Sequence, residues 1–187
     1  ISTLNIETLT NYSLKLIGAL SLHPTGCALI NETGMLSLFS QMYLSSVYSD
    51  PKIPLLILTN LAKADCQIPD VSLIISCLMQ DLVDSSINRS GILNTLIYLI
   101  SSSPNSVQEH DLQYVVLSLL SSKQEPVINT LILQLFEACD MEKLKTFYQQ
   151  IADKTISILS NDLMMYPELL NSAIDLLVSF STFFDMT

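Results

Sequence analysis

The chain has 187 residues, of which 49% are hydrophobic and 14% charged, and its formal net charge is −10. A chain of this length can bury a sizeable core, and this composition requires one. The 8 basic residues are scattered, so the clusters of Lys and Arg that contact phosphates are absent and no nucleic-acid partner is predicted.

Apolar residues recur at helical spacing through almost the whole chain, and only 4 Gly are present for the tight turns of an all-β fold. Pro51, Pro126 and Pro167 lie near expected first helical turns, where the missing N–H is not needed. Pro24 and Pro104 follow apolar segments and prevent a helix from continuing. The pattern predicts an all-α fold with helices at residues 6–22, 25–32, 35–48, 52–64, 69–83, 90–102, 107–121, 125–139, 141–160 and 166–184.

Similar apolar segments recur along the chain and start about 40 residues apart. They are LIGALSLH (16–23), LILTNLAK (56–63), LNTLIYLI (93–100), LILQLFEA (131–138) and LLVSFSTF (176–183), and a second set of apolar segments lies between them. A two-helix unit repeated at this interval is typical of armadillo or HEAT-type solenoids, in which neighbouring pairs bury each other's apolar faces.

The stretch LSLHPTGCALINETGMLSLF (20–39) resembles the join between two armadillo repeats. The order in that family is an apolar third helix, a short first helix, a glycine and a longer second helix, which places Gly34 at the glycine and Ile30 toward the core. The next stretch, PKIPLLILTNLAKADCQ (51–67), looks like the following third helix, with Asn60 where the family has asparagine. Glycine suits the sharp change of chain direction because it has no Cβ to clash.

The resemblance is best over residues 1–66, and residues 67–187 are similar to plain HEAT-like helix pairs. It implies one armadillo-like domain over residues 1–187, a right-handed superhelix of about four helix pairs. Because the first residue is Ile1, we expect the chain to be a fragment of a larger protein. Nuclear-import adaptors of this superfamily bind basic peptides through a Trp-x-x-x-Asn array, but here Leu56 stands four residues before Asn60 and the chain contains 0 Trp, so that array is not predicted.

The sequence offers no catalytic constellation. There is no phosphate-binding glycine loop and no HExxH motif, and the two histidines, His23 and His110, are far apart in the sequence. We expect His23 to cap a helix end beside Pro24 and His110 to be a solvated first-turn residue. The cysteines, Cys27, Cys66, Cys77 and Cys139, form no CxxC pair and lie among apolar neighbours, as buried reduced thiols do. We therefore predict no enzyme activity, no cofactor and no metal site.

No stretch supplies the ~20 consecutive apolar residues that a transmembrane helix needs. Without a membrane span or a signal peptide in view, and with cysteines expected to be reduced, we predict an intracellular protein, cytoplasmic or nuclear. A centrosomal location is compatible with these observations but does not follow from them.

The function favoured by this pattern is a non-catalytic protein–protein interaction scaffold. The resemblance implies that the last helix of each unit lines a concave face that binds a peptide or a partner helix, and the acidic composition suits a basic partner. Polar residues that interrupt the apolar pattern of these helices are the candidate contacts, with Tyr98 as the best single choice. They are Asn60, Lys63, Asn94, Tyr98, Gln134, Glu137, Asp175 and Ser179. The alternative is that they form only the solvent-facing stripe of amphipathic helices.

The last predicted helix ends in the aromatic residues Phe180, Phe183 and Phe184 without a polar cap. These side chains are expected either to close the core of this module or to pack against neighbouring repeats of the same chain, a partner or a second copy. The second possibility favours an alternative function, a regulatory subunit or domain that controls an enzyme through an obligate apolar interface.

Overall fold

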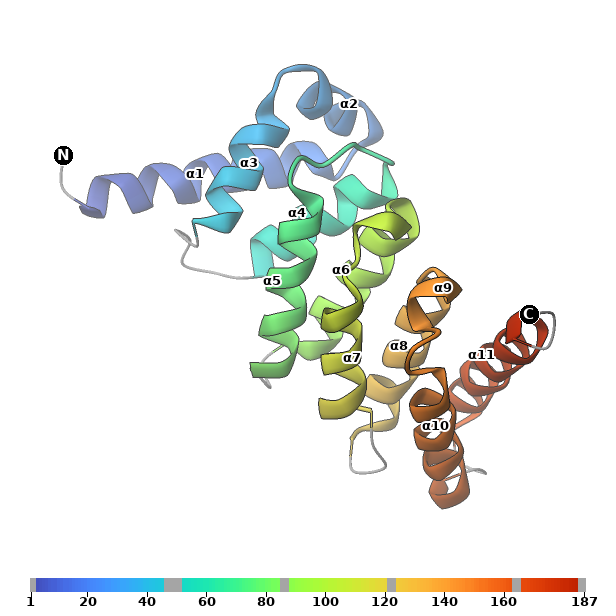
Figure 1. Ribbon diagram of the computed structural model, residues 1–187. Coiled ribbons are helices and arrows are strands. Elements are labelled where there is room, and N and C mark those ends of the chain that lie inside the picture. The colour runs from blue at the N-terminus through green and yellow to red at the C-terminus, as the bar shows by residue number, and fades with distance from the viewer. Residues whose placement is uncertain (1–2, 46–51, 85–87, 121–123, 163–165, 185–187) are drawn as a thin grey trace. The chain divides into compact units, whose positions relative to one another are not determined.

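The computed structural model describes residues 3–45, 52–84, 88–120, 124–162 and 166–184, and these form helices without any strand (Figure 1). The all-α prediction is therefore confirmed. The chain divides into two compact units, Ile1–Cys77 (unit 1) and Leu78–Thr187 (unit 2), and the division falls inside α5 (Val71–Asp84).

Unit 1 contains α1 (Thr3–Ser21), α2 (Pro24–Glu32), α3 (Met35–Leu44), α4 (Lys52–Lys63) and the first part of α5. Helix α1 contacts α2, α3 and α4, so it is the central helix of this unit. Ile30, Phe39, Ile57, Leu58 and Leu61 are completely buried in its core, which confirms that Ile30 faces inward.

Two glycines allow the sharp path from α1 through α2 to α3. Gly34 has a φ angle of 75°, in the left-handed region that side chains with a Cβ disfavour. Gly26 permits a close approach instead, because a Cβ atom at this position would lie 1.9 Å from the carbonyl oxygen of Leu20 at the end of α1. The turn residue expected from the sequence is thus present at Gly34, and Gly26 adds a second requirement at the α1–α2 contact.

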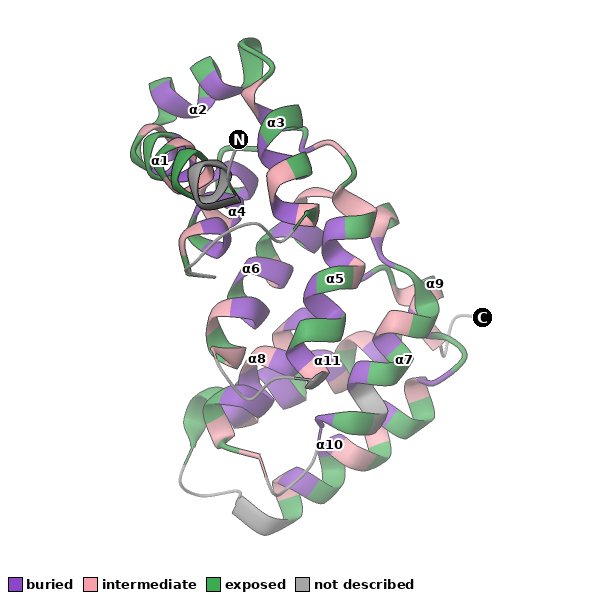
Figure 2. Cartoon of the chain, turned by 90° about the vertical axis from the view of Figure 1, so that its left-hand side faces the viewer, coloured by how far each residue is buried: buried purple, intermediate pink, exposed green. Residues whose placement is uncertain are grey.

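Unit 2 contains the rest of α5 and the following elements, in chain order: α6 (Arg89–Ser102), the 3-10 turn η1 (Pro104–Ser106), α7 (Glu109–Ser118), α8 (Pro126–Glu137), α9 (Met141–Leu144), α10 (Tyr148–Asp162) and α11 (Pro167–Phe184). Helix α8 packs against both α6 and α11, so these three helices form a row. Figures 1 and 2 agree in placing α7 and α10 in a second layer beside α6 and α8, and the buried residues of α6 and α8, purple in Figure 2, form the core between neighbours.

A lysine of α9 stabilises the connection between α6 and α7. The Lys143 ammonium donates to the carbonyl oxygens of Pro104, Asn105 and Val107 at 3.3, 2.9 and 2.7 Å. Lys154 similarly donates to the carbonyl oxygen of Leu120 at 3.0 Å. These cations satisfy backbone acceptors that have no partner within a helix.

The prediction of a single helix over residues 141–160 was wrong. The short helix α9 ends at Leu144, and α10 begins only at Tyr148 after a turn that buries Phe147. Asp140 caps α9 by accepting a hydrogen bond from the Glu142 backbone N–H at 3.1 Å. The other predicted helices are present within a few residues of their expected boundaries, although the ends of the helices predicted at 35–48 and 107–121 lie outside the described residues.

Candidate functional site

The row of α6, α8 and α11 carries most of the polar residues expected to line a binding face. Helices α6 and α8 are mostly buried, whereas many residues of α11 are exposed. Asn94 and Tyr98 are exposed on α6, Glu137 is exposed on α8, and Asp175 is exposed on α11. Because α8 packs against both neighbours, these residues belong to adjacent helices of one row.

Three of the predicted residues, Gln134, Glu137 and Asp175, interact across the contact between α8 and α11. The Gln134 side-chain amide donates to the Ser172 hydroxyl at 3.4 Å. One helical turn further along α8, partial burial raises the pKa of the Glu137 carboxyl, and the nearby Asp175 carboxylate raises it further. Neither α8 nor α11 contains a Lys or Arg, so the two carboxylates have no basic neighbour on their own helices.

The candidate residues of α6 differ in how much of their side chain is available. The Asn94 amide donates to the carbonyl oxygen of Ser90 in its own helix at 2.8 Å. Tyr98 is 38% exposed and presents part of its ring on the same face of the helix, one turn further on. Ser179 on α11 is half-buried. Tyr98 is consequently the largest accessible side chain among the predicted contacts of α6.

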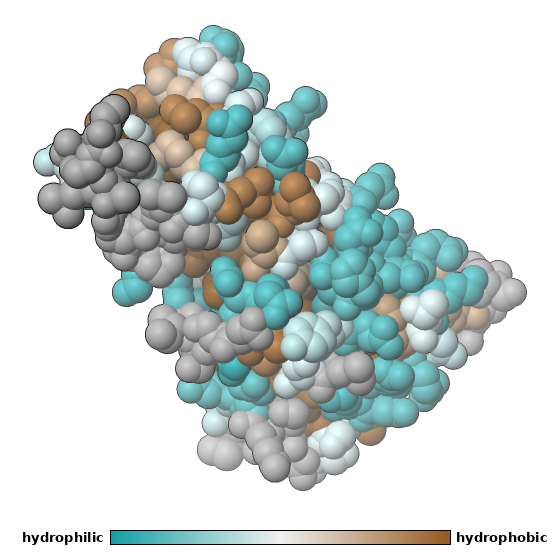
Figure 3. All heavy atoms as spheres, turned by 60° about the vertical axis from the view of Figure 1, so that its left-hand side comes forward, coloured by the Kyte–Doolittle hydropathy of each residue, from teal (hydrophilic) through white to brown (hydrophobic). Residues whose placement is uncertain are grey.

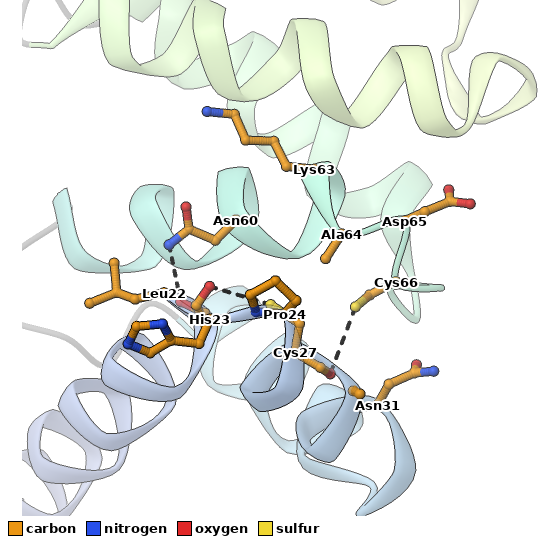
Figure 4. Close-up of a pocket in the computed structure, with 12 residues that line it drawn as sticks. Leu22, His23, Pro24, Cys27, Asn31, Asn60, Lys63, Ala64, Asp65 and Cys66 are labelled. Carbon is orange, nitrogen blue, oxygen red and sulfur yellow. Dashed lines mark hydrogen bonds between the residues drawn. The ribbon is translucent and has the colours of Figure 1, made fainter.

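Asn60 and Lys63 lie in unit 1 and line a cavity of about 580 Å³. Figure 4 shows this cavity where the ends of α1 and α4 meet α2. The Asn60 amide donates to the Ser21 hydroxyl at 3.2 Å, which joins α4 to α1. His23 is the N-cap residue of α2, where its side chain makes no capping hydrogen bond. At the end of α1, where the cap was expected, the His23 backbone N–H donates to the Leu20 carbonyl oxygen at 3.2 Å.

Two thiols are also near this cavity. The Cys27 thiol donates to the Ser21 carbonyl oxygen at 3.3 Å, and the Cys66 thiol approaches the Cys27 carbonyl oxygen at 3.9 Å. Burial raises the pKa of both thiols, which disfavours the nucleophilic thiolate. Sequence reasoning missed this juxtaposition, although the separation of 39 residues between the two cysteines matches the repeat interval.

The aromatic residues at the end of α11 pack within unit 2. Phe180 is buried, and Phe184 stacks on Tyr148 of α10 with 4.3 Å between ring centroids. Phe183 meets Phe184 edge to face at 5.1 Å. Phe180 and Phe184 therefore join α11 to Tyr148 of α10, whereas Phe183 packs on Phe184 of its own helix.

Within the described ranges, no group of three or more His, Cys, Asp and Glu side chains could hold a metal ion. His110 contacts Asp111 at 3.2 Å at the exposed start of α7. No helix in the described part of the chain is both long and apolar enough to cross a membrane.

Comparisons with protein-family models, with curated proteins and with solved structures found no match to this chain.

Proposed function

We propose that each unit is a stretch of an α-solenoid and that the chain is a non-catalytic scaffold, which binds a basic segment of a partner protein on the face formed by α6, α8 and α11. The observation that carries the proposal is the electrostatic repulsion between the Glu137 carboxyl of α8 and the Asp175 carboxylate of α11, two helices of this row that pack against each other. A solenoid fold supports such a role because stacked helices present an extended surface rather than an enclosed site.

Hydrogen bonds between helices support the repeat architecture. In unit 1, Asn60 and Ser21 are 39 residues apart in the sequence, as are Cys66 and Cys27. In unit 2, Gln134 and Ser172 are 38 residues apart. Lys143 bonds to carbonyl groups that lie 36, 38 and 39 residues before it. Other bonds between elements span shorter intervals, 34 residues for Lys154 and Leu120 and 29 for Ser40 and Pro69. Recurrence of intervals of 36–39 residues in both units is expected when each helix packs beside its counterpart in the next repeat.

The chemistry of the face favours a cationic ligand. The Glu137 and Asp175 carboxylates repel each other, and neither α8 nor α11 contains a Lys or Arg. A Lys or Arg side chain from a partner would relieve this repulsion. Tyr98 on the adjacent α6 adds an accessible aromatic ring, which provides apolar contact area and a surface for a guanidinium group. Recognition by this face would therefore be electrostatic in part and sensitive to salt.

The experiment uses the full chain and fluorescent peptides in which Arg and Leu alternate, with a matched peptide in which Glu replaces Arg. Fluorescence anisotropy gives the affinities at low and high salt. We expect only the Arg peptide to bind, and the double variant Glu137→Gln, Asp175→Asn to weaken its binding about tenfold at low salt, which corresponds to about 1.4 kcal/mol. Tyr98→Ala should weaken binding at both salt concentrations.

The matched control is Glu142→Gln on α9, which removes one exposed carboxylate outside the row of α6, α8 and α11. It should leave the affinity for the Arg peptide unchanged. Equal binding of the Arg and Glu peptides, or a double variant that binds as the unmodified chain does, would contradict the proposal.

A further inference from the structure

Helix α1 has two apolar faces, and only one of them is covered. Leu14 and Gly18 belong to the face that packs into unit 1. Leu9, Tyr12 and Leu16 are 68%, 69% and 58% exposed. Successive residues of an α-helix are rotated by about 100°, so Leu16 points directly away from the midpoint between residues 14 and 18. Leu9 and Tyr12 lie within about 40° of Leu16, so all three exposed side chains are on the side of α1 opposite to the packed face. Figure 2 views α1 nearly end-on, with exposed residues along its outer edge.

The exposed side chains follow the spacing of a helix–helix seam. Leu9, Tyr12 and Leu16 are separated by three and four residues, and the exposed Ala19 continues the series after three more. This alternation of three and four is the a/d pattern by which one α-helix packs along another. In Figure 3 hydrophobic areas, drawn in brown, interrupt the hydrophilic surface over unit 1. We refer to Leu9, Tyr12, Leu16 and Ala19 as the α1 seam.

Polar residues bound the α1 seam on one side. Thr8 and Lys15 are exposed there, and Lys15 is the single charged residue among residues 8–21 of α1. Its ammonium nitrogen lies 6.0 Å from the centre of the Tyr12 ring, and no carboxylate of the described residues forms an ion pair with it. A cation beside an a/d seam occupies the flanking position at which coiled-coil partners place Glu.

We propose that the α1 seam docks an amphipathic α-helix of a partner protein, with Leu or similar residues at its a and d positions and a carboxylate beside them that pairs with Lys15. This surface is separate from the face of α6, α8 and α11 and does not depend on the function proposed for that face. The interaction is a small one, since the three large side chains expose on the order of 400 Å² or less, well under the area of a stable dimer interface.

The same observations disfavour two other occupants. A second copy would bring two Lys15 side chains to one seam, and each chain carries a net charge of −10. A membrane surface calls for a wide apolar face bordered by several cations, whereas the α1 seam is one residue wide at each turn and has one lysine beside it.

The test uses the full chain and a fluorescent three-heptad peptide with Leu at positions a and d and Glu at e and g. A matched peptide carries Lys at e and g. We expect the Glu peptide to bind at least tenfold more tightly than the Lys peptide, and Leu16→Asn to weaken its binding at least fivefold. Lys15→Glu should reverse the preference between the two peptides, a result that general loss of structure would not produce.

Two variants separate this surface from others. Leu73→Asn, at a 59% exposed leucine of α5, is the matched control and should bind the Glu peptide as the unmodified chain does. The double variant Glu137→Gln, Asp175→Asn should bind the Glu peptide as the unmodified chain does. The peptide measurements on the α1 seam therefore test this inference without depending on the function proposed for α6, α8 and α11.

Three results would overturn the inference. The first is the absence of binding, or equal binding of the Glu and Lys peptides. The second is concentration-dependent dimerisation in sedimentation velocity that Leu16→Asn abolishes while neither peptide binds, which would assign the α1 seam to a second copy. The third is cosedimentation with vesicles of phosphatidylcholine and phosphatidylserine that Leu16→Asn abolishes while neither peptide binds, which would assign it to a membrane surface.

Discussion

Replacing Gly26 by alanine tests the packing of α2 against the end of α1. The added methyl carbon would lie 1.9 Å from the Leu20 carbonyl oxygen and 2.7 Å from the Leu20 carbonyl carbon. Both are backbone atoms, so a change of side-chain rotamer cannot remove the overlap. An ordinary contact requires at least 3.4 Å, and α2 must therefore move by about 1.5 Å relative to α1.

Gly18→Ala provides the matched comparison, since it adds the same methyl group to a helix of the same unit. At Gly18 the new Cβ would meet Ile57 side-chain atoms at 3.7 and 3.8 Å, which are favourable contacts. We expect Gly18→Ala to stabilise the chain by about 0.5–1 kcal/mol through helix propensity. The same gain at Gly26 is outweighed by overpacking, which we expect to cost about 3 kcal/mol.

Urea unfolding of both variants, followed by circular dichroism at the helix band, gives the free energies of unfolding. The two variants should differ by about 3 kcal/mol, because the propensity gain is common to both and only the steric cost differs. A Gly26→Ala variant as stable as Gly18→Ala would show that α2 does not approach α1 closely and would refute the reasoning.

The remaining predictions concern charge and thiol chemistry. Lys143→Met should lower the free energy of unfolding, measured by urea titration, by about 2 kcal/mol, because three carbonyl oxygens lose their donor. The control Lys145→Met removes only a 3.9 Å contact with Glu142 and should change the free energy of unfolding by less than about 0.5 kcal/mol. Alkylation at pH 8 followed by mass spectrometry should modify the exposed Cys77 first and Cys139 last, because burial raises the pKa of Cys139 to about 12. A raised pKa means that folding disfavours the ionised Glu137 carboxyl, so Glu137→Gln should be more stable than the unmodified chain at neutral pH. This difference should shrink as the pH falls and disappear at about pH 3, where the carboxyl is protonated in both folded and unfolded states.

Helical periodicity predicted most of the fold because the apolar face of each helix must be buried whatever its neighbours are. The turn at Gly34 was also predictable, since a left-handed φ angle has a direct residue preference. The break between α9 and α10 was not, because residues 141–160 keep a helical apolar pattern through Leu144 and Phe147. The turn there buries Phe147, which is a tertiary effect.

The candidate site was predictable in composition but not in geometry. Spacing along α8 and α11 selected Glu137 and Asp175, yet their proximity follows from how the two helices pack. Asn60 was selected as an exposed contact, whereas its amide bonds to Ser21 on the neighbouring helix. Partners of this kind come from another helix distant in the sequence, and a pattern along one helix carries no information about them.

The nearly equal intervals of two bonds between helices, one in each unit, have a consequence for how such a chain can change over evolutionary time. Ser21 and Asn60 are joined across 39 positions, and Gln134 and Ser172 across 38. Duplication of a segment of that length would supply each new donor with an acceptor already in register, whereas gain or loss of a few residues between the partners would separate them. Such a chain can therefore lengthen most readily by segments of that length, and single substitutions at one partner should be accompanied by changes at the other.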